Sequence, residues 1–149
     1  MAEIDLTQAE ADSLIAMEKH KLNDDLIHFP DPGGRIAISL QSPDRRELFT
    51  VDITRSGIKL TKATFQNRGR QVVVLLRLDL DGAPHRNPDG TEVPCPHLHI
   101  YREGYADKWA VPAPPELTAL DGSLYSTVDL FMQRCNVTQM PIIQKGLFS

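Results

Sequence analysis

The stretch Val72-Val73-Val74-Leu75-Leu76-Arg77-Leu78-Asp79-Leu80 decides how the rest of the chain is interpreted. It is nearly continuous in Val and Leu, which is typical of a central strand buried on both faces of a sheet. Only Arg77 and Asp79 interrupt it, and side chains two residues apart in a strand point to the same face. The stretch therefore predicts a central strand with two charged side chains on one face.

Further strands are predicted on both sides of this stretch. Apolar and polar residues alternate over residues 36–40 and 49–54, and a third strand begins at Ile58 and extends to residue 68. A fifth strand covers residues 97–102, after a turn-rich loop over residues 81–96. A loop of this length in a compact domain usually indicates function or a small hairpin.

Helical patterns lie near both ends of the chain. Thr7 and Glu10 match a capping box, and the apolar stripe after them predicts a helix that ends between residues 21 and 23. Ser126 and Asp129 predict the cap of a last helix. We therefore predict one α+β domain over residues 1–149, with an N-terminal helix, an antiparallel sheet of about five strands that is twisted or partly closed, and a C-terminal helix.

Composition places the chain among folded proteins outside the membrane. It has 149 residues, of which 41% are hydrophobic and 24% charged, the usual globular profile. No apolar run reaches the roughly 18 residues that span a bilayer, and residues 1–14 are acidic where a signal peptide would be basic. With only Cys95 and Cys135, a disulfide framework is not expected, so we predict a reducing, cytoplasmic location.

The net charge of -4 is unevenly distributed. Residues 45–77 hold eight Lys and Arg against two acidic residues. The excess of acid over the whole chain argues against nonspecific coating of nucleic acid, but a local basic field can hold a phosphate backbone. The alternative is a solvated surface of strands.

The densest group of reactive side chains includes His85, His97 and His99. In a strand, His97 and His99 point to one side while Leu98 and Ile100 point to the core. Antiparallel pairing with residues 72–80 then places Arg77 and Asp79 beside these two histidines.

Such a set suits the cleavage of a phosphodiester, because His transfers protons and Arg binds the anionic oxygens. RNA would supply its own 2'-hydroxyl as nucleophile. The leading interpretation is therefore an RNA-binding protein. Its possible activity is that of an endoribonuclease that needs neither a metal ion nor a cofactor. Its predicted catalytic residues are Arg77, Asp79, His85, His97 and His99, and its predicted nucleic-acid contacts are Lys62, Gln66, Arg68, Arg86 and Tyr101.

A metal site is the main alternative. His97 and His99 followed by Glu103 form a credible ligand set for zinc, iron or manganese, close in spacing to the first cupin signature. The second cupin signature needs a later histidine, and no histidine follows position 99, so a cupin site would have to recruit His85 or Asp79 out of pattern. A third interpretation gives these residues no chemistry: the histidines face solvent, Arg77 and Asp79 form a structural ion pair, and the protein is a noncatalytic inhibitor or interaction protein.

The residues from Leu78 to Ala110 also carry a resemblance. The run Pro96-His97-Leu98-His99-Ile100-Tyr101-x-Glu103-Gly104-Tyr105-x-Asp107-Lys108-Trp109-Ala110 resembles an uncharacterised family of bacterial and phage proteins of similar length. The order Arg-Leu-Asp, a turn, then Pro-His-x-His is distantly similar to the TumE-like toxins of toxin-antitoxin pairs. That resemblance implies a small ribonuclease-like toxin or a relative linked to phage defence, with a cognate antitoxin or other protein as partner. It transfers Arg77, Asp79, His97 and His99 to the site, whereas the longer loop with His85 and Asp89 is a departure from the pattern.

Overall fold

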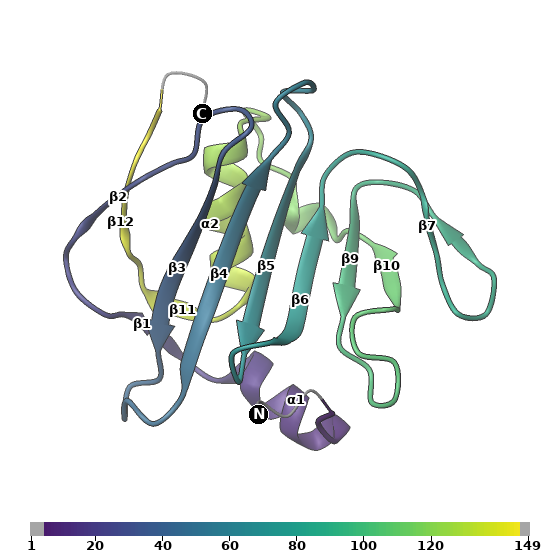
Figure 1. Cartoon of the computed structure of the whole chain (residues 1–149), viewed down its shortest axis with the longest axis horizontal. Coiled ribbons are helices and arrows are strands. Elements are labelled where there is room, and N and C mark those ends of the chain that lie inside the picture. The colour runs from purple at the N-terminus through teal and green to yellow at the C-terminus, as the bar shows by residue number, and fades with distance from the viewer. Residues whose placement is uncertain (1–4, 147–149) are drawn as a thin grey trace.

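The computed structural model describes residues 5–146, in which eight strands form one sheet (Figure 1). From edge to edge they are β10 (Ala110–Pro112), β9 (His97–Ile100), β6 (Val73–Asp79), β5 (Ala63–Gly69), β4 (Leu48–Arg55), β3 (Arg35–Gln41), β1 (Lys19–Lys21) and β11 (Val137–Gln139). All neighbours are antiparallel except β1 and β11, which are parallel. The sheet is therefore larger than the predicted five strands, because the three-residue strands β1, β10 and β11 extend its edges.

Two short strand pairs lie outside this sheet. The parallel pair consists of β2 (Leu26–His28) and β12 (Ile142–Gln144). The antiparallel pair, β7 (His85–Arg86) and β8 (Glu92–Val93), forms a hairpin that projects beyond β9 and β10 (Figure 1). The turn-rich loop over residues 81–96 thus contains a small hairpin.

The helices are α1 (Gln8–Ala16) and α2 (Leu124–Arg134), with a short 3-10 helix η1 (Pro115–Leu117) before α2. The predicted capping box is present, since Thr7 and Glu10 exchange side chain to backbone hydrogen bonds. The predicted end of α1 is wrong: the helix stops at Ala16, because the next residues join the sheet as β1. The predicted cap of α2 also moves, since Ser123 rather than Ser126 accepts the capping hydrogen bond.

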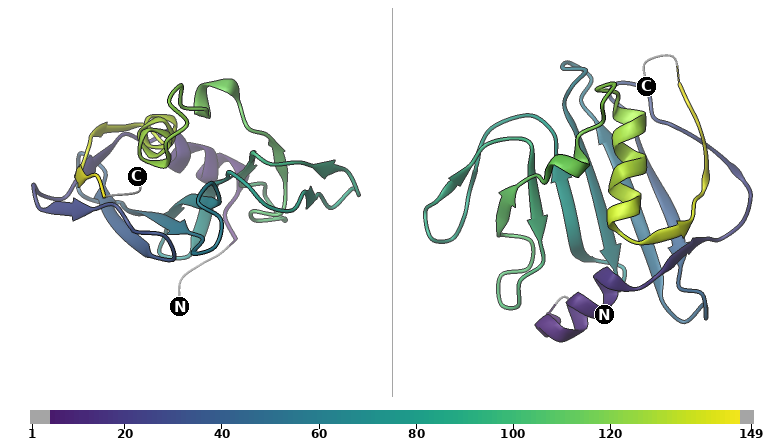
Figure 2. Two further views of the ribbon diagram at one scale, coloured as in Figure 1. Left: turned by 90° about the horizontal axis from the view of Figure 1, so that it is seen from above. Right: turned by 180° about the vertical axis from the view of Figure 1, so that it is seen from behind.

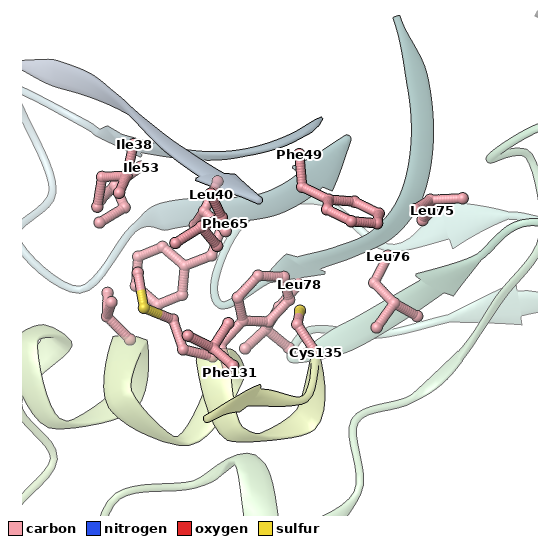
Figure 3. Packing of buried hydrophobic residues seen from close by; sticks show 14 of the residues in the cluster. Ile38, Leu40, Phe49, Ile53, Phe65, Leu75, Leu76, Leu78, Phe131 and Cys135 are labelled. Atoms are coloured by element: carbon pink, nitrogen blue, oxygen red, sulfur yellow. The ribbon is translucent and has the colours of Figure 1, made fainter. Parts of the chain in front are cut away.

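One face of the sheet carries the core. Helix α2 lies across this inner face (Figure 2), and Phe131 on α2 packs against Phe65 on β5 with ring centroids 6.1 Å apart. Buried side chains from β3 to β6 fill the space between sheet and helix (Figure 3). The third strand begins at Ala63 and not at Ile58, whose side chain is exposed in the preceding turn.

The period of two along β6 and β9 assigns their side chains to the two faces as predicted. Leu76, Leu78 and Leu98 are buried in the core, and Leu80 and Ile100 pack partly buried against it. The prediction that residues 72–80 are buried on both faces is wrong. Within residues 5–146, no helix covers the outer face of the sheet (Figure 2), so Val74, Arg77 and Asp79 remain partly exposed there.

Candidate metal centre

The outer face of β6 and β9 brings four predicted site residues together. The two strands pair antiparallel with Arg77 opposite His99 and Asp79 opposite His97. The four polar side chains thus share one face, as the sequence predicted from the alternation along both strands, and a shift of β9 by one residue would have turned His97 and His99 toward the core.

Asp79 is the centre of the group. Its Oδ2 lies 3.1 Å from the Nε2 of His97 and 3.1 Å from the Nε2 of His99. Its other oxygen, Oδ1, accepts a hydrogen bond of 3.0 Å from the Thr64 hydroxyl on β5. One carboxylate oxygen therefore faces two imidazole nitrogens at once.

Two backbone carbonyls fix the orientation of the rings. The Nδ1 of His97 lies 3.2 Å from the carbonyl oxygen of Val93, and the Nδ1 of His99 lies 2.8 Å from that of Asp107. A carbonyl only accepts hydrogen bonds, so we assign the proton of each neutral ring to Nδ1. The Nε2 atoms then present lone pairs toward Asp79.

Arg77 supports this assignment for His99 independently. Its Nη2 lies 3.1 Å from the Nε2 of His99, and a guanidinium has donors but no acceptor. The contact is favourable only when His99 Nε2 carries a lone pair. Arg77 also donates from Nη1 to Asp107 at 2.7 Å, and its Nε lies 3.5 Å from Asp79 Oδ2.

The Asp79 carboxylate stays ionised in this setting. Burial raises the pKa of Asp79, but the charge of Arg77 and the Thr64 hydroxyl that donates to Oδ1 lower it, and its pKa lies well below the usual range. Asp79 can thus offer a negatively charged oxygen to a metal ion over the whole physiological pH range.

Two of the three distances in this group match the spacing of metal ligands. Asp79, His97 and His99 form a group whose ligand atoms all lie within 4.8 Å of one another. Two ligands at about 2.0–2.2 Å from one ion, at angles between octahedral and tetrahedral, lie about 2.8–3.6 Å apart. Both contacts of Asp79 fall in this range, and the two rings need only draw together to share an ion.

The loops around the strands enclose the group. The His97 and His99 side chains are 3% and 0% exposed, whereas Asp79 and Arg77 keep 20% and 27% exposure. The interpretation in which the histidines face solvent is therefore wrong. Solvent reaches the site on the side of the carboxylate and the guanidinium.

His85 covers the site from the β7–β8 hairpin. Its ring centroid lies 4.5 Å from that of His99 and 5.9 Å from that of His97, and its Nε2 lies 2.7 Å from the Lys108 carbonyl oxygen. The hairpin is attached by Asn87, whose amide exchanges two hydrogen bonds with the backbone of Ala110 on β10, at 3.0 and 2.8 Å.

The structure places Glu103 away from this group. Its carboxylate accepts a hydrogen bond of 2.7 Å from the Gln8 backbone at the start of α1, because β9 ends at Ile100 and the chain turns away. Asp79 takes the position that the sequence-based ligand set gave to Glu103. The carbonyls of Val93 and Asp107 were not predicted, since they belong to loops whose course no periodicity reveals.

The five predicted nucleic-acid contacts do not form one surface. Gln66 and Arg68 lie on the outer face, where both bind Asp52, in a shallow groove of about 660 Å³. Arg86 extends from the hairpin and lies 3.4 Å from Glu92. Lys62 lies in the turn before β5, with its side chain near Gly82. Tyr101 is only 2% exposed and its hydroxyl bonds the backbone of Leu6, so it packs α1 against β9 and cannot stack on a base.

Comparison with known proteins identifies the family. A model described as a family of unknown function (DUF6978) matches residues 6–137. The chain belongs to this family. Neither a search of curated proteins nor a search of solved structures found a match. Within residues 5–146, no helix combines the length and the apolar character needed to cross a membrane.

Proposed function

We propose that this member of the family is a hydrolase that depends on a divalent transition-metal ion held by Asp79, His97 and His99. The observation that carries the proposal is the convergence of two imidazole Nε2 atoms on one carboxylate oxygen, with a backbone carbonyl beside the Nδ1 of each ring. Without a positive centre between them, these acceptor atoms repel each other at 3.1 Å. Carbonyl oxygens that bind the far Nδ1 atoms are also the usual partners of metal-binding histidines.

Three protein ligands suit catalysis better than a purely structural role. Catalytic zinc sites typically have three protein ligands and leave a position for water, whereas structural sites are closed by four. A metal ion at such a site supplies a hydroxide near neutral pH. We assign the associated proton transfer to His85, the imidazole that lies against the ligand rings without belonging to the ligand set.

A titration of the chelator-treated protein with Zn²⁺ and Mn²⁺ tests this proposal. We expect one ion per chain. Removal of a residue that only holds a metal ligand in place lowers metal affinity by about 10- to 100-fold, and we expect His97→Ala, His99→Ala and Asp79→Asn each to lower it by more than that. The matched control is His20→Ala, because His20 binds Glu18 on another part of the surface. Hydrolysis of a panel of esters should stop with chelator and return with the ion.

Two results would contradict the proposal. One is that the unmodified chain binds no ion more tightly than a nonspecific surface site would. The other is an ion that all three ligand variants bind as well as the unmodified chain does.

A metal-independent ribonuclease is the second candidate, and Arg77 is the observation that favours it. Its guanidinium touches both His99 and Asp79, and a guanidinium beside two imidazoles can bind a phosphate while they transfer protons. Gln66 and Arg68 lie on the same face of the sheet, where a strand of RNA could continue. In this candidate, as in the TumE-like toxins, an antitoxin would be the partner.

Incubation with RNA and the matching DNA, in chelator, separates the two candidates. The ribonuclease predicts cleavage of RNA alone, with a loss of about 100- to 10,000-fold in His97→Ala or His99→Ala. Lys62→Ala and Arg68→Ala should instead weaken binding and reduce its salt dependence. Cleavage that requires an added ion would favour the metal-dependent candidate, and no cleavage of any RNA would reject the ribonuclease.

A further inference from the structure

Arg77 competes for one of the atoms that the proposed centre offers to an ion. Its Nη2 lies 3.1 Å from His99 Nε2, and its Nε lies 3.5 Å from Asp79 Oδ2. Both contacted atoms belong to the ligand set. The guanidinium thus brings positive charge to two of the three facing acceptor atoms, while the Nε2 of His97 faces only Asp79.

The two contacts differ in whether they are compatible with an ion. A carboxylate oxygen has two lone pairs, so Asp79 Oδ2 can bind an ion and still face Arg77. An imidazole nitrogen has a single lone pair, which His99 Nε2 can give either to the Nη2 proton or to an ion. The Nη2 contact and an ion on His99 therefore exclude each other.

Arg77 keeps its ion pair with Asp107 when the contact with His99 breaks. Its Nη1 donates to Asp107 at 2.7 Å, on the loop whose backbone carbonyl also holds His99. The guanidinium is planar and has five N–H donors, so Nη1 can stay on Asp107 while Nη2 is freed. Arg77 is also more exposed than the three proposed ligands, at 27% against 20% for Asp79 and 3% and 0% for the two histidines. A freed Nη2 lies on the side from which a substrate enters.

From this we infer that Arg77 binds an anionic oxygen of the substrate at the metal centre. In the metal-free protein its guanidinium contacts His99 and Asp79, and a bound ion displaces its Nη2 from His99. The inference rests on the proposed function, and it deepens it by naming the substrate class. The substrate carries a phosphoryl or carboxylate group that binds the ion through one oxygen and Arg77 through another. Arg77 favours such groups because its planar donors match two oxygens of one anion.

The first test measures the affinity of the chelator-treated chain for Zn²⁺ in the Arg77→Met variant. Loss of the competing donor and its charge should tighten zinc binding by about tenfold to a hundredfold, the range for a hydrogen bond with a charged group. The control is Arg35→Met, since Arg35 lies on the same outer face three strands away, on β3, and its removal should leave zinc affinity unchanged. Arg77→Gln keeps a polar group against Asp107 and should change zinc affinity in the same direction, and thermal unfolding checks that each variant is folded.

The second test uses inorganic phosphate and acetate as probes of the zinc-loaded protein. At least one of them should bind the unmodified protein and Arg35→Met, and it should bind Arg77→Met at least about tenfold more weakly. Phosphate alone would indicate a phosphoryl substrate, and acetate alone a carboxylate.

The results separate this inference from the proposed function. If the unmodified chain and Arg77→Met both fail to bind zinc, the metal centre itself is rejected. If zinc binds but Arg77→Met binds it equally or more weakly, or if anion binding survives without Arg77, only the role of Arg77 is rejected.

Discussion

A single lysine joins the C-terminal ends of both helices. Lys19 is fully buried, and its Nζ donates to the carbonyls of Ile15 at 3.1 Å, Met17 at 2.8 Å and Cys135 at 2.7 Å. Met17 and Cys135 are the C-caps of α1 and α2, where the helix dipole favours a cation. Burial lowers the pKa of Lys19 to about 8, with Cys135 acting in the opposite direction, and the Nζ lies 4.6 Å from the centroid of the Phe49 ring.

We predict that Lys19→Met lowers the free energy of unfolding by about 2–4 kcal/mol, because three buried acceptors lose their donor. Urea denaturation measures the change. Lys21→Met is the control, since Lys21 forms only a surface pair with Asp24 and should cost at most about 1 kcal/mol. Equal effects of the two substitutions would contradict this role for Lys19.

The thiol beside this lysine predicts a pH dependence. Burial raises the pKa of Cys135 to about 12, whereas an unfolded cysteine titrates near about 8.5. Between these values the folded state keeps a proton that the unfolded state loses, so this thiol makes stability fall as pH rises. From pH 8.5 to 10, the free energy of unfolding of Cys135→Ala should fall less steeply, by up to about 1.4 kcal/mol per pH unit. Lys19 titrates in both proteins, so parallel curves would contradict the assignment to Cys135.

At the scale of the element, the β7–β8 hairpin depends on one asparagine. Asn87 is buried and makes two hydrogen bonds to Ala110, the residue of β10 that pairs with His99. Asn87→Ala should therefore release the hairpin and destabilise the chain by about 1–3 kcal/mol. Hydrogen exchange should become faster over residues 81–93 and stay slow in β4 and β5. Asn23→Ala, at an exposed turn, is the control, and an unchanged hairpin would show that other contacts hold it.

Elements with a long periodic pattern were predictable, and short ones were not. The alternation over residues 49–54 and the run at residues 72–80 correspond to β4 and β6, and alternation gave the inward face of Leu98 on β9. By contrast, β1 and β11 have three residues each, and the residues that pair, such as Lys19 and Val137, lie more than a hundred positions apart in the sequence. So few residues show no periodicity, and only the completed sheet makes them strands.

At the scale of the whole molecule, the two faces of the sheet have separate roles. The inner face packs against α2, while the outer face carries Arg77, Asp79, His97 and His99 and is covered by no helix in the described part of the chain (Figure 2). The sequence predicted which residues meet on the outer face, because alternation decides the face of each side chain. It could not predict that loop carbonyls orient the rings, and it could not decide between Glu103, Asp79 and His85 as the third ligand, because both depend on where the loops pass.

Anomalous diffraction from crystals grown with zinc tests the central claim most directly. We predict one anomalous peak per chain, at about 2.0–2.2 Å from Nε2 of His97, Nε2 of His99 and a carboxylate oxygen of Asp79, with the Nη2 of Arg77 withdrawn from His99. A zinc ion bound elsewhere on the surface, with the contact between Arg77 and His99 intact, would contradict the account.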